Sequence, residues 1–315
     1  MRRSLVGLIV TLFDLLPKKL SVRSFFIFWS LAPYLIVKFK RRSLLRKKPK
    51  QTSVTVNDSD RVELERLLSI PPDFTGRGDE VCVRYSGGTD STLAAAYMAM
   101  HFRKVHLLTF GASYQGLTLN TVSSDPSSTM VNVQLLKKKY GRERFVHHVI
   151  DVQPLRDELY FKQFQYYAVE KDFLRVSLCP ACTMAMHKLA IDYCKRNAVT
   201  AVTDGSCGES GAFPWQMQHR DNMKSIGDVY EQQGLTYIVN PCYKISESGW
   251  ALLKMGVINE PVDRKSFSYR RKTQQFCIPI QLQSLCRNLY GREMPKDSTS
   301  VRRFIKSMCT KLVQQ

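Results

Sequence analysis

The residues best suited to chemistry are Ser86-Gly87-Gly88-Thr89-Asp90-Ser91. The apolar run 81–85 precedes them and the helix-favouring run 92–100 follows, so the expected order is strand, tight turn, helix. Two adjacent glycines permit positive φ and leave no side chain in the way of a ligand. The N–H groups and the dipole at a helix N-terminus attract anions. The segment therefore predicts a phosphate-binding loop, and a connector that binds nothing is the plain alternative.

A second reactive group is Cys179-Pro180-Ala181-Cys182, directly before a predicted helix over 183–197. The helix dipole favours the thiolate form of such cysteines. The spacing alone is compatible with a redox pair, half a zinc site or part of an iron–sulfur site. The chain has 9 cysteines but no second CxxC, and no cleavable signal peptide is evident. We therefore expect reduced thiols in a cytosolic setting rather than a secreted disulfide framework.

The elements that must position these groups alternate between strand and helix. Strands are predicted over 80–85, 104–110, 145–151, 198–203 and 237–240, and helices over 90–102, 126–140, 154–173, 183–197 and 246–255. This alternation predicts an α/β fold with a doubly wound parallel sheet of about five strands. Ligands of such sheets bind beyond the carboxyl ends of the strands. The glycine loop, Phe110-Gly111 and Asp204-Gly205-Ser206 all follow strand ends, so we expect them to converge on one crevice.

The glycine loop is not a GxxxxGK[ST] phosphate loop, because no lysine follows the glycines. It resembles the SGGxDS loop of the PP-loop ATP pyrophosphatases, whose fold is that of the adenine nucleotide alpha hydrolases. Those enzymes split ATP between the α and β phosphates and adenylate a substrate oxygen. The resemblance implies ATP and Mg²⁺ as cofactors, with Asp90 catalytic. It also implies a set of nucleotide-binding residues: Ser86, Gly87, Gly88, Thr89, Asp90 and Ser91 at the phosphates, Phe110 and Gly111 at the adenine, Asp204, Gly205 and Ser206 at the ribose or substrate.

The order of motifs over about residues 80–285 is similar to that of the ATP-dependent sulfur transferases, which thiolate tRNA bases or sulfurate a nickel-pincer cofactor. Thr203-Asp204-Gly205-Ser206 looks like their Asp-Gly-Thr-Asn segment, and Cys277 occupies the place of a late cysteine. The resemblance implies a [4Fe-4S] cluster on Cys179, Cys182 and Cys277, or a persulfide on Cys182 or Cys277 without a cluster. It further implies a sulfur donor and an acceptor that is a tRNA or a small metabolite.

The chain departs from this family in two places. Ile245-Ser246-Glu247-Ser248 stands where a lysine is usual, and Cys207-Gly208-Glu209 stands where Asn and Asp often follow Asp-Gly. Two alternatives therefore stay open. One is an amide-forming relative that uses ammonia, with Zn²⁺ on the cysteines. The other is a membrane-tethered nucleotide-binding module without turnover.

The charge of the chain is concentrated at its start. The net charge is +20, and residues 1–50 hold 13 Lys or Arg and one Asp, which gives +12. Their two apolar runs, 4–16 and 25–37, are shorter than the ~20 residues of a membrane-spanning helix. We expect in-plane helices on an anionic membrane surface, with a helical cap or an RNA-binding arm as alternatives. The predicted location is the cytoplasm, with peripheral attachment to the inner face of the membrane.

The composition also predicts where the parts of the chain begin and end. We expect a basic, apolar N-terminal extension over 1–50, and a linker over 51–78 with a short helix at 60–68. The ATP-binding domain is predicted over 79–260. A basic helical segment over 261–315 carries Cys277.

Overall fold

The computed structural model describes residues 58–69, 74, 77–111, 129–159, 178–206 and 220–259. All of these belong to one compact unit of the chain. The predictions for residues 1–50 and 261–315, Cys277 included, lie outside the described residues. None of the helices in the described ranges is both long enough and apolar enough to cross a membrane.

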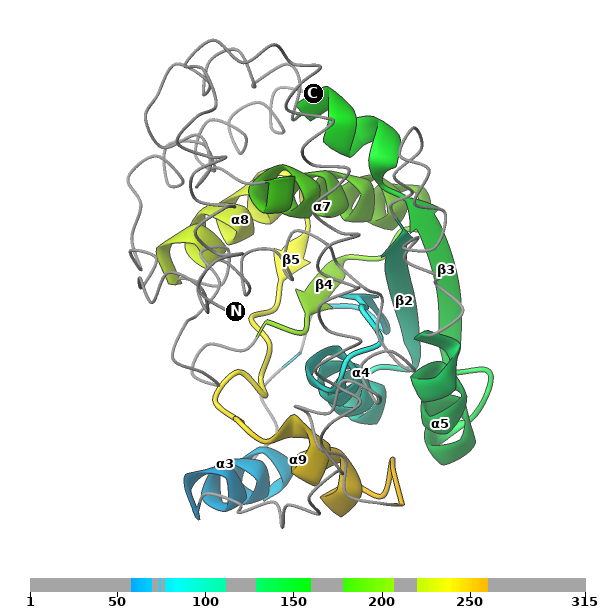
Figure 1. Cartoon of the computed structure of the whole chain (residues 1–315), viewed down its shortest axis with the longest axis vertical. Helices are drawn as coiled ribbons and strands as arrows, with labels where there is room; N and C mark the ends of the chain where they lie inside the picture. Colours follow the sequence, from blue (N-terminus) through cyan, green and yellow to red (C-terminus); the bar gives the residue numbers. More distant parts are fainter. Residues whose placement is uncertain are drawn as a thin grey trace, which may run out of the picture. The chain divides into compact units, whose positions relative to one another are not determined.

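Five parallel strands form one sheet in the order β3-β2-β1-β4-β5 (Figure 1). The strands are β1 Glu80–Arg84, β2 Lys104–Gly111, β3 Phe145–Asp151, β4 Ala201–Asp204 and β5 Thr236–Tyr237. In the central register, Arg84 pairs with Leu108 on one side and with Asp204 on the other. The predicted fold class, an α/β fold with a parallel sheet of five strands, is confirmed.

Helices cover both faces of this sheet. They are α3 Asp58–Ser69, α4 Thr89–His101, α5 Met130–Tyr140, α7 Leu178–Arg196, α8 Arg220–Gln232 and α9 Ser248–Lys254. Alternate residues of β1 point to opposite faces. Val81 and Val83 join a core with α3, α4, α5 and α9, whereas Cys82 joins a second core with α7 and α8. The sheet is therefore doubly wound, with α4 and α7 on opposite faces.

The sequences of β2 and α4 are nearly continuous apolar runs, because both elements are buried on every side. β2 is buried from Val105 to Phe110, and α4 is buried from Ser91 to Ala99. Strands covered on both faces lose the polar and apolar alternation of a half-exposed strand. Small alanine side chains in α4 bring that helix close to the sheet.

Several element boundaries differ from the predicted ones. α7 begins at Leu178, so the CxxC lies inside the helix rather than before it. β4 begins at Ala201, not at 198, because Ala198 has a positive φ of 53° in the turn after α7. β5 covers only Thr236–Tyr237. Beyond it, the Asn240 side chain accepts a hydrogen bond from the Cys242 N–H at 3.0 Å and turns the chain away from the sheet.

One helix was not predicted. α8 occupies Arg220–Gln232, between the predicted strands 198–203 and 237–240, where no helix was expected. Its apolar residues Met223, Ile226 and Tyr230 are buried and recur at helical spacing. Conversely, residues 153–159 are helical as expected, and the rest of the predicted 154–173 helix lies outside the described residues.

Candidate functional site

The strand order creates one topological switch point, between β1 and β4. The chain leaves β1 toward β2 and β3, and it leaves β4 toward β5, in the opposite direction. Crevices in doubly wound sheets open at such a point, beyond the carboxyl ends of the strands. Ser86–Ser91 follows β1 and Asp204-Gly205-Ser206 ends and follows β4, so both predicted segments lie at this place.

The glycine loop has the backbone conformation that its sequence predicts. Gly87 has a φ of 78°, a left-handed conformation that side chains disfavour. Asn132 of α5 donates from Nδ2 to the Gly87 carbonyl at 2.8 Å. The Ser91 hydroxyl lies 3.1 Å from the Ser86 hydroxyl and donates to the Gly88 carbonyl at 3.1 Å. The loop is thus fixed by its own hydroxyl groups and by a buried amide from a neighbouring helix.

Helix α4 begins at a glycine. The N-cap residue is Gly88, which has a φ of −73° and no side chain to cap the helix. The first intrahelical bond runs from the Thr92 N–H to the Gly88 carbonyl at 2.9 Å. The N–H groups of the first turn have no partner within a helix. This end of α4 therefore offers donors and a positive dipole end to an anion.

The two predicted segments are in direct contact at Gly205. A Cβ atom built on Gly205 would lie 2.6 Å from both the Cα and the N of Ser91. Only a glycine allows the backbone after β4 to approach the first turn of α4 this closely. Asn240 Nδ2 also donates to the Ser206 carbonyl at 2.9 Å, which fixes the same turn from the far side. The expected convergence of these segments is confirmed, and their role in nucleotide binding stays a prediction.

Phe110 and Gly111 end β2, on the other side of β1. The Phe110 side chain is buried in the core beneath α7. Gly111 continues the sheet by pairing with Asp151, and its carbonyl accepts from the Val152 N–H at 2.9 Å. The pair lies at the carboxyl edge as expected, and its contact with adenine stays a prediction.

A buried ion pair links the last residues of β1 and β4. Arg84 Nη2 lies 3.2 Å from Asp204 Oδ2, with side chains 13% and 4% exposed. The Tyr237 hydroxyl donates to the same carboxylate oxygen at 2.9 Å, and the Ser206 N–H donates to Oδ1 at 2.8 Å. Asp204 is thus neutralised by Arg84 and two donors. The sequence held a signal for this pair, a charged residue within an apolar strand.

The same ion pair adjoins a buried histidine of α7. His187 Nδ1 lies 2.9 Å from the Tyr230 hydroxyl, and the Tyr230 ring stacks on Tyr237 with centroids 5.3 Å apart. Burial lowers the pKa of His187 well below its ordinary value, and the Arg84 guanidinium lowers it further. Burial likewise raises the pKa of Tyr237 well above its ordinary value, and Asp204 adds to this effect. His187 is therefore neutral, and Arg84 is the cation of this cluster.

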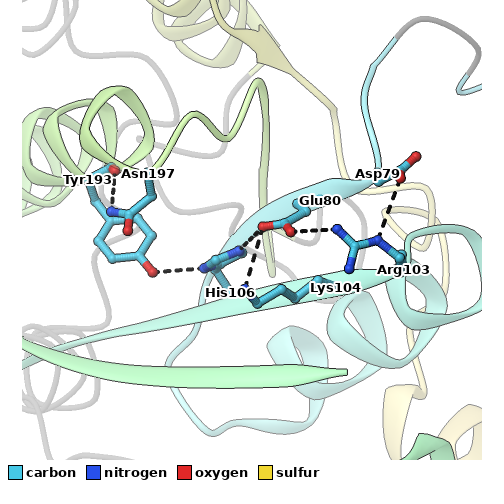
Figure 2. A network of polar contacts seen from close by, with 7 residues as sticks. All are labelled: Asp79, Glu80, Arg103, Lys104, His106, Tyr193 and Asn197. Carbon is cyan, nitrogen blue, oxygen red and sulfur yellow. Dashed lines mark hydrogen bonds and ion pairs between the residues drawn. The ribbon is translucent and has the colours of Figure 1, made fainter. Parts of the chain in front are cut away.

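The CxxC lies at the N-terminal end of α7. Both cysteines of the motif belong to the first turns of α7, which covers Leu178–Arg196. Cys182 is half-buried and packs against the α7 core. At the other end of α7, the Tyr193 hydroxyl lies 2.8 Å from His106 Nδ1, whose Nε2 lies 2.7 Å from Glu80, the first residue of β1 (Figure 2).

These contacts fix the direction of α7. Its C-terminal end lies at the amino ends of β1 and β2, so its N-terminal end points toward the carboxyl edge, where the glycine loop lies. Within the described part of the chain, no group of three or more His, Cys, Asp or Glu could hold a metal ion. The third predicted ligand, Cys277, lies outside that part. The set of Cys179, Cys182 and Cys277 stays a prediction.

The region that departs from the family pattern also reaches the glycine loop. Ser248, the first residue of α9, places its hydroxyl oxygen 2.6 Å from Asp90 Oδ1. The sequence analysis noted residues 245–248 only for the missing lysine. The two polar residues that support the loop from outside it, Asn132 and Ser248, were not predicted.

Comparison with known proteins gave matches among solved structures only. No protein-family model matches the chain, and no curated protein matches it. The U34-tRNA thiolase NcsA from Methanococcus maripaludis, solved with its [4Fe-4S] cluster, has 13% identity and a TM-score of 0.37, with 82% of this chain and 80% of that one covered. NMN synthetase from Francisella tularensis has 15% identity and a TM-score of 0.39, with 82% and 94% covered. The NH3-dependent NAD synthetase from Campylobacter jejuni subsp. jejuni has 15% identity and a TM-score of 0.40, with 81% and 92% covered.

Proposed function

We propose that this chain is a PP-loop ATP pyrophosphatase, an enzyme that cleaves ATP between the α and β phosphates and adenylates a substrate oxygen. The observation that carries the proposal is the meeting of two glycine turns at the N-terminus of α4, where Gly87 has a positive φ and Gly205 lies against the backbone of Ser91. A triphosphate is the anion that suits two glycine-lined turns meeting at one helix N-terminus.

The residues of the loop have separate roles in this proposal. Backbone N–H groups of the first turn of α4 would stabilise the charge that develops on pyrophosphate, the electrostatic contribution that usually dominates such reactions. The hydroxyl groups of Ser86 and Ser91, 3.1 Å apart, would donate to phosphate oxygens after a small rotation. Arg84 is paired with Asp204 at 3.2 Å, so it would hold the end of β4 beside the turn rather than add net charge to the site.

The donors near the loop fit Mg²⁺. Asp90 lies in the first turn of α4 and is half-buried, whereas Asp204 is already paired with Arg84. Nucleotide sites hold Mg²⁺ with one or two carboxylates, phosphate oxygens and waters, so one carboxylate is enough. Bound there, Mg²⁺ would neutralise phosphate charge and assist the leaving pyrophosphate. Asp90 is the residue that would hold it.

The test is the substitution Asp90→Ala. We expect pyrophosphate release from ATP to fall by at least about a hundredfold, because the carboxylate that holds the metal is lost. Asp79→Ala is the matched control, since Asp79 is exposed and lies at the amino edge of the sheet, where its carboxylate is 3.5 Å from Arg103 Nε. Undiminished pyrophosphate release from Asp90→Ala would refute the site assignment.

For the second half of the reaction, we propose sulfur as the nucleophile. Adenylation turns the substrate oxygen into part of an AMP leaving group, and a sulfur nucleophile then displaces AMP. Support comes from the position of the CxxC at the start of α7, the end of the helix that points toward the loop, where the helix dipole favours thiolates. The nucleophile would be sulfide carried on the unligated iron of a cluster, or the outer sulfur of a persulfide on Cys182 or Cys277. In the persulfide form, the thiolate of the other cysteine would then cleave the remaining S–S bond, which releases the product and leaves a disulfide for an external thiol to reduce.

Anaerobic purification with iron, zinc and sulfide analysis tests the sulfur proposal against the amide-forming alternative. We expect brown protein with a broad absorption near ~400 nm and acid-labile sulfide. Both should be lost in Cys182→Ala and kept in Cys242→Ala, since Cys242 is buried in the opposite core. Colourless protein that contains zinc would favour the amide reaction. Release of thiocyanate by cyanide from a metal-free protein would indicate the persulfide form.

A further inference from the structure

A buried hydroxyl holds the Asp90 carboxylate from outside the glycine loop. Ser248 Oγ lies 2.6 Å from Asp90 Oδ1 and 2.8 Å from Thr89 Oγ1, and Ser248 is 1% exposed. A carboxylate accepts hydrogen bonds and donates none, so the Ser248 proton points to Asp90. Hydrogen bonds to an ionised acceptor are short and strong, as this distance indicates. The bond fixes the orientation of one carboxylate oxygen.

The position of Ser248 is in turn set by Asp60 of α3. Asp60 is 1% exposed, and its carboxylate accepts three hydrogen bonds from the turn that leads into α9. The donors are the Ser246 N–H at 3.0 Å, the Ser246 hydroxyl at 2.8 Å and the Glu247 N–H at 2.9 Å. A buried carboxylate with three donors is stable only in this arrangement. The turn is therefore fixed immediately before Ser248.

We propose that Asp60 and Ser248 are positioning residues for the Asp90 carboxylate. The inference rests on the proposed function, because it concerns the group that would hold Mg²⁺ with ATP. Helix α3 lies before the first strand of the sheet, so this arrangement makes the ATP site depend on a segment outside the strand and helix alternation. Hydrogen-bond partners of metal-binding carboxylates orient them and strengthen metal affinity.

Isothermal titration calorimetry with ATP, in the presence of Mg²⁺ and in EDTA, tests the proposal. We expect Ser248→Ala to raise the Kd for ATP with Mg²⁺ about tenfold, the lower end of the usual effect of such partners. The Kd in EDTA should not change, since the glycine loop and its N–H groups stay intact. Ser69→Ala, an exposed serine at the end of α3, is the matched control and should change neither value.

The Asp90→Asn background shows whether Ser248 acts through Asp90. If it does, adding Ser248→Ala to Asp90→Asn causes no further loss of affinity, because interacting residues are not additive. A full additional tenfold loss would overturn the proposal, and so would an unchanged Kd for Ser248→Ala alone. A Kd that rises equally with Mg²⁺ and in EDTA would also overturn it, since that result indicates a general distortion of the loop.

Asp60→Asn provides a second, independent variant. We expect it to raise the Kd with Mg²⁺ and to leave the Kd in EDTA unchanged. If Ser248→Ala does not fold, this variant decides the question in the same way. Failure of the proposed function is detected by a different measurement, pyrophosphate release by the wild-type protein, because a nucleotide-binding module without turnover would bind ATP and release none.

Discussion

Gly205 is the residue of the site with the least space for a side chain. Its backbone lies against the first turn of α4, where a Cβ atom would meet the Cα and N of Ser91 at 2.6 Å. The obstacle is backbone on the opposite element, so no side-chain rotation can relieve it. Gly205 also follows the neutralised Asp204 directly, and a shift there would disturb the bonds of Asp204 to Arg84 and Tyr237.

We therefore expect Gly205→Ala to lower the free energy of unfolding by about 1–3 kcal/mol, the usual cost of overpacking. Pyrophosphate release from ATP should fall with it, because the first turn of α4 must move. Gly227→Ala is the matched control. It lies within α8, its Cβ would meet Tyr237 at an ordinary 3.8 Å, and alanine in a helix is more favourable than glycine. Urea unfolding of both variants measures the difference, and equal stability would contradict the packing argument.

Among the elements, those with a strong local pattern could be predicted from the sequence. β1, β2, β3 and α4 are runs of apolar residues bounded by glycine, charge or turn residues, and their predicted ranges agree with the structure within one or two residues. The glycine loop could be predicted for the same reason, since its chemistry and its flanking elements are contiguous. Parallel order and the switch point then follow from the alternation alone.

Elements without a clear apolar pattern in the sequence were harder to predict. α8 places Met223, Ile226 and Tyr230 on one face, but Lys224, Asp228 and other charged residues between them conceal the pattern. β5 was overestimated because its apolar run continues past the last ladder pair at Tyr237. For α8 and for β5, packing against the sheet determines whether the element forms and where it ends, and the local sequence preference does not.

The supports of the site could not be predicted, because each one depends on contacts between distant segments. Asp60 and Ser246 are separated by 186 positions, and Asp90 and Ser248 by 158. In the sequence they are ordinary polar residues. Asn132 gave a weak signal, since it is the one buried polar residue of α5, beside Val133 and Leu136. A single sequence does not say which distant backbone group such an amide will meet.

At the scale of the whole described unit, the two kinds of chemistry lie on opposite faces of one sheet. The glycine loop leads into α4 on one face, and the CxxC begins α7 on the other. Both lie toward the carboxyl edge, where the chain leaves β1 and β4 in opposite directions. In the proposed function, a substrate at the switch point would lie between the nucleotide on one face and the thiolates on the other, and adenylation would precede sulfur transfer.

The same unit buries histidines in their neutral form, and this fixes how its stability depends on pH. Burial lowers the pKa of His147 to about 4, with smaller contributions from Lys137 and His148. His147 Nε2 lies 2.8 Å from the Thr109 hydroxyl between β2 and β3. His187, in the core on the other face, has a pKa well below its ordinary value for the same main reason. Both residues bind a proton near pH ~6.5 in the unfolded chain.

The sign of the effect follows from proton uptake. Below pH ~6.5 the unfolded chain binds protons at these histidines that the folded chain does not bind, so the free energy of unfolding falls as the pH falls. The loss is at most about 1.4 kcal/mol per pH unit for each histidine, and for His147 it ends near pH 4, where the folded form is protonated too.

Urea unfolding between pH 7.5 and pH 5 measures the slope of the free energy of unfolding against pH, and these two values lie on either side of ~6.5. We expect a smaller slope in His187→Gln and in His147→Gln than in the wild type, because each variant lacks one group that takes up a proton on unfolding. An unchanged slope in both variants would show that neither histidine takes up a proton on unfolding, and the lowered pKa assigned to His187 beside Arg84 would then be wrong.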